Sequence, residues 1–481
     1  MDTSYISATY TWGQFAPEFA LVGLAALILM ADTFLPKIPK RAYALLAAAG
    51  TFIAACFMMR GEYASWFGFL ACAATTLSLL LAYDYRNVTV AALTGSDSEE
   101  GTAEFYALPL IACAGICCLA QARDLILFFV SLEVVTLSSY VLAGYFRRNQ
   151  GSIEAGVKYL ILGAMSTGFL VYGAAWYFGM SGSFTLDPLM AQVGLSGGAT
   201  HAGFLLAMAL LFAGALFKVG AAPMHVWIPD VYQGAPTPVS SFLATASKAA
   251  GFAALCLLVR PFRPFVAYFT DSVTIIVHAL ALVAAATLLI GNLGAIGQHN
   301  AKRLLGYSSI GQAGFILIFF VNLGGDIEPL VFNYLLAYTL ATAAAFFAIA
   351  MVRTQRGSEE ISAFRGLGKT NPRTAFLITV SFASLAGVPL TMGFLAKYYS
   401  FCAFIQATAV WDNLFWILPI MIICAAAGFY YYFKILRAMY WEKPQEDDKP
   451  LQVPPCTLAV LTACAILLLG MGTYPLLVTM D

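Results

Sequence analysis

Five charged residues lie inside long apolar segments of the sequence. They are Glu133, Lys158, Lys218, Lys248 and Lys397. A charge near the centre of a bilayer costs about 2.5–3.5 kcal/mol on insertion scales, so such residues are seldom accidental. Desolvation lowers the pKa of a lysine towards neutrality and a nearby carboxylate raises it, so a lysine beside a movable carboxylate can load and release protons. These residue types therefore indicate a proton relay within a membrane.

A static role is the alternative for each lysine. The side chain could extend to the membrane interface, or form an ion pair that only fixes helix packing. This alternative is strongest for Lys158, which lies one turn into its helix. Glu133 follows Asp124 by nine positions, or about 13.5 Å along a helix, which predicts a position near the middle of the membrane.

Two of the expected helices contain glycine and proline next to a lysine. The segment LFKVGAAPMHVWIPD has Pro223 after Lys218, and FASLAGVPLTMGFLAKYY has Pro389 before Lys397. Proline interrupts a helix, and interrupted helices at matching positions in two halves are typical of ion sites in transporters. The two prolines are 166 positions apart, which predicts paired units of about five helices. Alternatively, the prolines only shape the helix bundle.

Histidine titrates near neutral pH and can pass protons. His225, two residues after Pro223, could connect Lys218 with Lys248, or could only bond a carbonyl freed at the helix break. His299 and Lys302 could form a proton entry, or could be ordinary interfacial residues.

The amino-acid composition indicates that most of this chain lies in a membrane rather than in water. Of 481 residues, 61% are hydrophobic and 10% are charged, against about 25% charged in a soluble domain. Runs of roughly 20 apolar residues span a bilayer, which predicts an all-α polytopic membrane protein with about fourteen transmembrane helices. The expected helices are 16–35, 42–59, 64–84, 104–121, 124–146, 155–180, 202–229, 238–260, 270–292, 302–321, 328–351, 373–405, 412–438 and 455–478.

The basic residues predict an orientation. Seventeen of the 25 lysines and arginines fall in alternate loops and four in the opposite loops, so the positive-inside rule places both termini outside the cytoplasm. The expected units are an N-terminal three-helix segment (1–103), two five-helix units (104–260 and 261–440) and a C-terminal helix (441–481). The first eighteen residues contain no lysine or arginine, so we expect the first apolar run to be retained rather than cleaved.

Several other functions are not expected. The ten cysteines lie in apolar runs without a C-x-x-C pair, so we interpret them as small buried residues rather than ligands of a metal or an iron–sulfur cluster. No phosphate-binding glycine loop is present. Acidic and basic residues balance at 25 each, so no net charge favours nucleic acid.

Four segments carry a resemblance that covers nearly the whole chain. They begin SLEVVTLSSYVLAGYF, LFKVGAAPMHVWIPD, NAKRLLGYSS and FASLAGVPLTMGF. With these segments the chain resembles the antiporter-like membrane subunits of respiratory complex I, the bacterial NADH:quinone oxidoreductase. The block SIEAGVKY and the chain length resemble the subunit N branch of that family.

The resemblance implies roles for individual residues. Glu133 would be the helix-five glutamate that pairs with Lys218 on the broken helix seven. Lys248 would be the central lysine on helix eight, Lys397 the lysine of the broken helix twelve near the exit side, and Lys158 the lysine of helix six. The family fold consists of two inverted five-helix repeats, each with one broken helix.

The resemblance also implies partners and a location. This chain would hold no cofactor, whereas NADH, FMN, iron–sulfur clusters and quinone would bind to other subunits. Its partners would be the lipid bilayer, the neighbouring antiporter-like subunit and small membrane subunits, in a bacterial cytoplasmic membrane. The alternatives are a subunit of a multi-subunit cation/proton antiporter, a subunit of another ion-pumping dehydrogenase or hydrogenase, and a scaffold whose charges are structural.

Overall fold

The computed structural model describes residues 12–35, 39–59, 63–86, 88, 102–186, 199–263, 271–323, 325–444 and 450–473. Within these ranges the regular structure is helical, and strand-like pairing is limited to two isolated bridges, Asp124 with Thr185 and Asn300 with Glu360. Thirteen helical segments are long and apolar enough to cross a membrane. Two shorter helices, α18 and α19, follow each other and together have the length of one more crossing. The predicted all-α polytopic architecture is confirmed.

The principal helices run along the chain as follows. They are α2 (Ala16–Phe34), α3 (Lys40–Met58), α4 (Tyr63–Asp84), α6 (Ala103–Ala120), α7 (Leu125–Ala143), α8 (Gln150–Ser181), α10 (Ala199–Val219), α11 (Trp227–Gly234), α12 (Thr237–Ala244), α13 (Ala246–Val259), α14 (Asp271–Ile296), α15 (Ala301–Leu317), α16 (Ile327–Arg356), α17 (Leu367–Thr370), α18 (Pro372–Ala386), α19 (Met392–Thr408), α20 (Ile417–Tyr440) and α21 (Pro455–Thr473).

Both predicted helix interruptions are present. Gly220 follows α10 with φ +74°, and Gly387 ends α18 with φ +88°. Glycine adopts this left-handed conformation without the steric cost that a Cβ imposes. At Gly220 a Cβ would also lie 1.8 Å from Cδ1 of Ile228. The chain resumes as helix α11 after the first interruption and as α19 after the second.

A third interruption was not predicted. The expected helix 238–260 is divided at Thr245, which separates α12 from α13 with φ −111° and ψ −78°. The hydroxyl of Thr245 donates to the carbonyl of Ser241 at 2.7 Å. Such back-bonding by threonine bends helices. Lys248 lies in the first turn of α13, directly after the bend.

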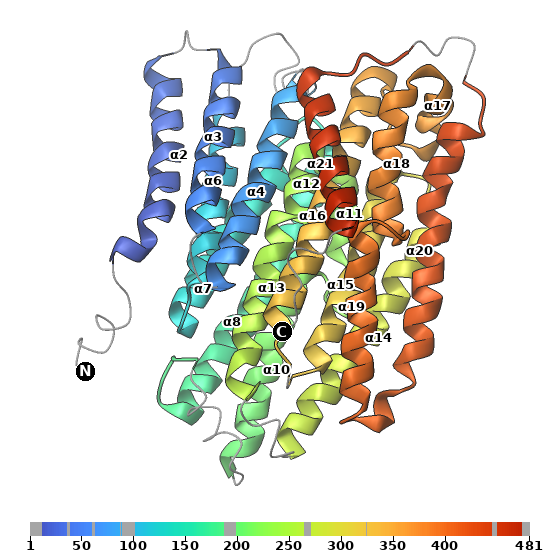
Figure 1. Cartoon of the computed structure of the whole chain (residues 1–481). Coiled ribbons are helices and arrows are strands. Elements are labelled where there is room, and N and C mark those ends of the chain that lie inside the picture. Colours follow the sequence, from blue (N-terminus) through green and yellow to red (C-terminus); the bar gives the residue numbers. More distant parts are fainter. Residues whose placement is uncertain are drawn as a thin grey trace.

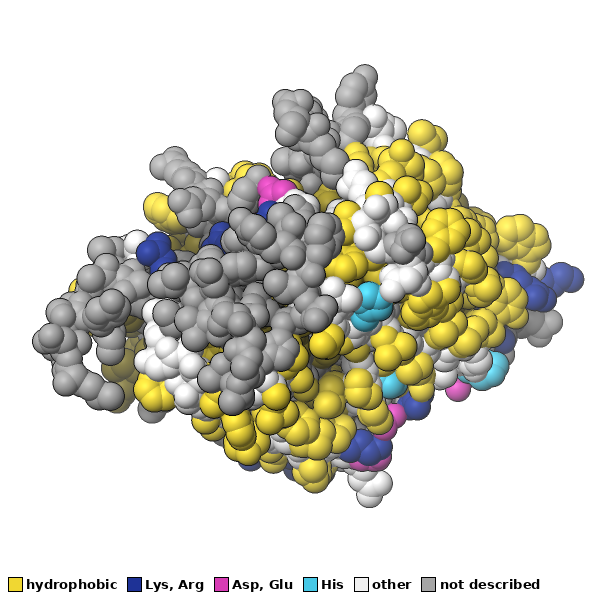
Figure 2. Space-filling view, turned by 90° about the horizontal axis from the view of Figure 1, so that it is seen from below, with side chains coloured by type: hydrophobic (Ala, Val, Ile, Leu, Met, Phe, Trp, Pro, Cys, Tyr) yellow, Lys and Arg dark blue, Asp and Glu magenta, His cyan; other side chains and the backbone are white. Residues whose placement is uncertain are grey.

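The helices form one elongated bundle, with α2 and α3 at one edge and α20 at the other (Figure 1). Helix α16 runs through the interior, and 94% of its apolar window is buried, against 22% for the span that includes α2. Large side chains such as Leu27, Ile161 and Ile466 are exposed on the outer helices. Hydrophobic side chains also dominate much of the visible surface in Figure 2. Such extensive exposed apolar surface is expected where lipid replaces water.

Small residues allow α14 and α15 to approach closely. A Cβ added to Gly291 of α14 would lie 2.2 Å from the backbone nitrogen of Gly311 on α15. Close packing of this kind at small residues is typical of transmembrane helix pairs. The contact positions α15, which carries several polar residues of the site described below.

Replacing Gly291 by valine should therefore separate α14 from α15. Overpacking of this kind costs about 1–3 kcal/mol. We expect a lower midpoint of thermal unfolding for Gly291→Val in detergent, measured by intrinsic tryptophan fluorescence. Gly168→Val is the control, because a Cβ at Gly168 meets nothing within 4 Å. Equal midpoints for the two variants would contradict the close approach.

Candidate functional site

Lys218 lies in the last turn of α10, immediately before the first interruption. Its side chain is buried, and Nζ donates to the hydroxyls of Thr136 on α7 at 3.2 Å and Tyr159 on α8 at 3.4 Å. Trp227, the first residue of α11, stacks on the Tyr159 ring at 4.4 Å. The interrupted helix therefore contributes both the lysine and a cover for one of its hydrogen-bond partners.

Glu133 lies one turn before Thr136 on α7 and is half-buried. Its carboxylate accepts a hydrogen bond of 2.8 Å from Thr167 on α8. Glu133 acts electrostatically on Lys218, but no ion pair joins the two side chains among the described residues. The α7 side chain that Lys218 contacts is instead Thr136, one turn after Glu133, so the predicted Glu133–Lys218 pair is an interaction without direct contact in this structure.

Lys248 is almost fully buried in α13. Its Nζ donates to the backbone carbonyl of Ser309 on α15 at 2.5 Å and also to the Ser309 hydroxyl. The ring of Tyr338 on α16 lies 5.3 Å from Nζ, and the hydroxyls of Tyr232 and Ser309 are 3.4 Å apart. Neutral oxygens and an aromatic face surround this lysine, and no carboxylate within the described part of the chain contacts it.

Lys397 lies on α19, beyond the second interruption, and is buried. Its Nζ donates to the carbonyls of Ala386 at 2.7 Å and Leu385 at 3.1 Å. These are the last residues of α18, whose carbonyls lack partners within the helix and carry the negative end of its dipole. The break between α18 and α19 thereby creates the binding position for Lys397.

Polar side chains of α15 lie between Lys248 and Lys397. Gln312 donates to the Leu385 carbonyl at 3.0 Å, the same carbonyl that Lys397 contacts. Gln312 also donates to the hydroxyl of Tyr432 on α20 at 3.2 Å. Ser308, next to the serine that binds Lys248, shares a hydrogen bond with that hydroxyl. Helix α15 therefore connects the surroundings of the two lysines.

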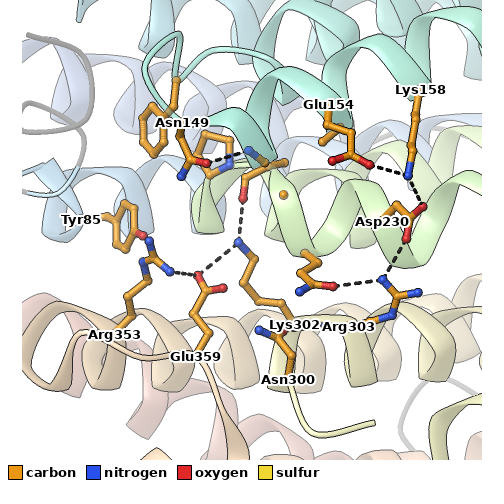
Figure 3. A pocket seen from close by; sticks show the side chains of 17 residues that line it. Tyr85, Asn149, Glu154, Lys158, Asp230, Asn300, Lys302, Arg303, Arg353 and Glu359 are labelled. Atoms are coloured by element: carbon orange, nitrogen blue, oxygen red, sulfur yellow. Dashed lines mark hydrogen bonds and ion pairs between the residues drawn. The ribbon is translucent and has the colours of Figure 1, made fainter. Parts of the chain in front are cut away.

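A polar cavity of about 380 Å³ lies near the ends of α8, α11, α15 and α16. Lys158, Asp230, Lys302, Arg353 and Glu359 are among its lining residues. Their side chains point towards one another in Figure 3. The cavity lies at the end of the bundle where the sequence predicts the basic loops. Helix α11 lines the cavity with Asp230 and also carries Tyr232, whose hydroxyl lies beside Ser309, the residue that bonds Lys248.

Lys158 belongs to this cavity. Its side chain is 43% exposed and pairs with Glu154 and Asp230, both at 2.7 Å. Arg303 contacts the other oxygen of Asp230 at 2.8 Å. The placement differs from the sequence interpretation, which put Lys158 inside an apolar helix. Helix α8 begins at Gln150, earlier than expected, and Lys158, about two turns into it, still lies at the polar end of the bundle.

A buried ion cluster forms the opposite wall of the cavity. Glu359 contacts Lys302 at 3.2 Å and Arg353 at 2.9 Å, and Lys302 also donates to the Ala235 carbonyl. The backbone nitrogen of Ala301 donates to the Glu359 carbonyl at 2.8 Å, so this backbone contact fixes the carboxylate beside Lys302. Lys302, proposed from sequence as part of a proton entry, is buried at this wall.

The histidines are less directly connected. His225 lies in the segment between α10 and α11, and its buried Nδ1 has no hydrogen-bond partner. Within the described part of the chain no hydrogen bond joins His225 to Lys218 or Lys248, so its role as a connection stays a prediction. His299 is exposed and is not among the residues that line the cavity.

Comparisons with known proteins agree with this geometry. Residues 122–422 match the family described as NADH:quinone oxidoreductase/Mrp antiporter, TM. NADH-quinone oxidoreductase subunit N of Brevibacillus brevis is 34% identical, over 98% of this chain and 94% of the relative. The chain belongs to the NADH:quinone oxidoreductase/Mrp antiporter family. Subunit N of Dehalococcoides mccartyi is 35% identical, over 95% of this chain and 96% of the relative.

Solved structures place the fold in the same family. A chain of respiratory complex I from Thermus thermophilus with bound aureothin has a TM-score of 0.76 and 30% identity, covering 95% of this chain and 97% of that one. A chain of the Mrp complex from Dietzia sp. has a TM-score of 0.79 at 20% identity, covering 97% of this chain and 51% of that one. The second likeness shows the shared fold alone.

The sequence did not predict most of the uncharged side chains that bond the buried lysines or connect their surroundings. Thr136, Tyr159, Ser309 and Gln312 were not singled out, although each lies in a segment that carries the resemblance. One usable signal was the spacing of Ser308, Ser309 and Gln312. Gln312 follows the two serines by four and three positions, so it lies one helical turn from each within an apolar helix.

Replacing Glu359 by glutamine should destabilise the buried cluster. Lys302 and Arg353 would lose their shared carboxylate, and breaking a buried pair costs about 3–5 kcal/mol. We expect a lower thermal midpoint for Glu359→Gln, measured in detergent. The neighbouring Glu360 is exposed, so Glu360→Gln is the matched control and should leave the midpoint unchanged. An unchanged thermal midpoint in both variants would show that the ion cluster does not contribute to the stability of the fold.

Proposed function

We propose that this chain is the proton-translocating membrane subunit, subunit N, of a bacterial NADH:quinone oxidoreductase. The observation that carries the proposal is the set of three buried lysines, Lys218, Lys248 and Lys397, each held by neutral oxygens. These lysines lie in a chain that aligns over nearly its full length with relatives of that name. A buried ammonium without a contacting carboxylate can lose its proton at modest cost, as a relay requires.

Protons enter through the polar cavity and reach Lys248. The Lys302–Glu359 pair lies at the cavity wall, and Lys302 bonds the Ala235 carbonyl at the end of α11. From α11 the Tyr232 hydroxyl leads to Ser309 and so to Lys248. Hydrogen bonds therefore join the groups at each end of the route, and one turn of α11, from Ala235 back to Tyr232, separates the two ends.

Glu133 controls the charge of Lys218. The glutamate acts on Lys218 without contacting it, so a small movement of α7 or a proton on Glu133 changes the field at the lysine. Tyr159, a partner of Lys218, also lies near Ser247, which precedes Lys248. A charge change in the neighbouring subunit would thereby be passed from Glu133 to Lys218 and onwards to Lys248.

Lys397 receives the proton and releases it on the opposite side of the membrane. Its surroundings are continuous with those of Lys248 through Ser308, Gln312 and Tyr432. The two interrupted crossings, α10/α11 and α18/α19, are five crossings apart and therefore run in opposite directions. This arrangement supports two inverted five-helix units, 104–260 and 261–440, each with its own lysine at a helix break.

Location and partners follow from the same proposal. The polar cavity faces the cytoplasm and both termini face the periplasm of a bacterial inner membrane, as the distribution of basic residues predicts. Other membrane-arm subunits adjoin the chain within the bilayer. NADH, FMN, the iron–sulfur clusters and quinone bind elsewhere in the complex, and this chain uses the energy of quinone reduction without holding a redox centre.

Replacing Lys218 by alanine in the native assembly tests the proposal. A positioned proton-transfer group contributes about 10²–10⁴-fold to a rate, so we expect turnover or pumping to fall by about tenfold or more. NADH:quinone oxidoreduction and proton uptake are measured together in sealed vesicles. The exposed Lys369 provides the matched control, since Lys369→Ala removes a lysine outside the relay. Normal pumping by the assembled Lys218→Ala complex would show that this lysine is structural, as the scaffold alternative predicts.

The antiporter alternative is tested in the same vesicles without an electron donor. A multi-subunit cation/proton antiporter exchanges sodium for protons when only a sodium gradient is supplied. We expect no proton movement under that gradient and full proton uptake once NADH and quinone are added. Sodium-driven exchange that Lys218→Ala abolishes would favour the antiporter instead.

A further inference from the structure

Three buried cysteines meet between α4 and α6, away from the lysines. Cys72 lies on α4, and Cys113 and Cys117 lie one turn apart on α6. All three are free thiols with no solvent exposure. From sequence each was interpreted as a small buried apolar residue, because Cys72 is 41 and 45 positions away from the other two and its proximity to them in space is not visible.

The sulfur positions fit a shared metal ion better than a disulfide. The Sγ of Cys72 lies 3.6 Å from the Sγ of Cys113 and 3.6 Å from that of Cys117, and all three sulfurs lie within 4.8 Å of one another. A zinc–sulfur bond of about 2.3 Å places two thiolates about 3.8 Å apart on a tetrahedral ion. A disulfide needs about 2.05 Å. The separations of Cys72 from Cys113 and from Cys117 are therefore each within a few tenths of an ångström of the spacing on a bound ion.

A second buried group points to the same place. Glu18, in the first turn of α2, is 3% exposed, and its Oε2 makes no hydrogen bond with any residue that the structure describes. Its Oε1 accepts from Gln121, directly after α6, at 2.6 Å. Glu18 also acts electrostatically on Cys113 and Cys72. An uncompensated carboxylate oxygen near three thiols is unexpected in an apolar bundle unless a cation or proton visits it.

We propose that Cys72, Cys113 and Cys117 form an intramembrane binding site for a thiophilic d¹⁰ cation, Zn²⁺ or Cu⁺, and that Glu18 is its entry carboxylate. Sulfur ligands select these ions over the hard cations Mg²⁺ and Ca²⁺. The site joins α4 to α6, which lie beside α2 at one edge of the bundle (Figure 1). Bound metal would tie the N-terminal helices to the helices of the relay.

Charge balance decides how the ion is held. Zn²⁺ binds two thiolates and one thiol, which releases two protons and leaves a neutral centre, whereas Cu⁺ needs one thiolate and releases one proton. Neutral centres are favoured because a net charge in an apolar interior is costly. No electron is transferred in either case. The free oxygen of Glu18 accepts one released proton, and the solvent at the end of the bundle receives any other.

Metal content of the native assembly tests the site. The purified complex is stripped with a chelator, loaded with Zn²⁺ alone or with Cu⁺ alone under a reductant, and desalted before elemental mass spectrometry. We expect the wild-type complex to bind either Zn²⁺ or Cu⁺ at one additional ion per complex. The comparison is with Cys72→Ser and with the double variant Cys113→Ser/Cys117→Ser. The ion that shows the difference identifies the occupant.

Two controls separate the site from general thiol binding. Cys464 is a buried free cysteine on α21, so Cys464→Ser should retain the full equivalent. Glu18→Gln keeps all three sulfurs and should bind the same amount several-fold more slowly, since carboxylates steer cations towards a site. Equal loading rates in Glu18→Gln and wild type would remove Glu18 from the proposal.

The wild type supplies a measurement that needs no variant. X-ray absorption at the metal edge, taken as a difference between loaded and stripped complex, should show two or three sulfur neighbours at about 2.3 Å. Oxygen or nitrogen neighbours alone, or no difference for either ion, would overturn the proposal. A disulfide between Cys72 and either partner, found by peptide mass spectrometry of the native assembly, would also overturn it.

Discussion

An ammonium group inside an apolar bundle must find oxygen ligands, and this requirement explains much of the architecture. Each of the three proposed relay lysines lies where a neutral oxygen of a neighbouring helix can accept its hydrogen bond. Lys397 uses the unpaired carbonyls at the end of α18, and Lys248 uses a carbonyl and a hydroxyl of Ser309. Lys218 uses the Thr136 and Tyr159 hydroxyls. Neutral ligands stabilise the charge without fixing it, so each lysine can also exist without its proton.

The helix interruptions are therefore part of the chemistry. A continuous helix satisfies its carbonyls internally and offers none to a neighbour, whereas an interrupted helix exposes several at one level of the membrane. The freed groups elsewhere are also satisfied, as when the nitrogen after the first break, on Ala222, donates to the Thr287 hydroxyl of α14 at 2.9 Å. Direct ion pairs occur at the polar end of the bundle, where Asp230 pairs with Lys158 and Arg303, and Glu359 pairs with Arg353.

The sequence predicted the membrane crossings and the two helix breaks well because both are local signals, whereas the relay roles of the lysines stay a prediction. Apolar runs of membrane length and a glycine–proline pair are visible without knowing any contact, and both predicted breaks occur at the expected residues. Contacts between distant segments could not be predicted in this way. The bend at Thr245, the link through Gln312 and the meeting of Cys72 with Cys113 depend on how helices pack, and one sequence carries little information about such pairings.

Gln312 has a different chemical character from its neighbours. Its amide donates to the Leu385 carbonyl and to Tyr432, while its Oε1 accepts from the Tyr334 hydroxyl. A neutral amide both donates and accepts hydrogen bonds, yet unlike lysine or histidine it has no ionisable proton. Gln312 therefore holds the Leu385 carbonyl, Tyr334 and Tyr432 together without itself taking up or releasing a proton. In the proposed relay, a proton passing from Lys248 towards Lys397 would use the hydroxyls of Ser308 and Tyr432, and the role of the Gln312 amide would be to keep the Tyr432 hydroxyl in position.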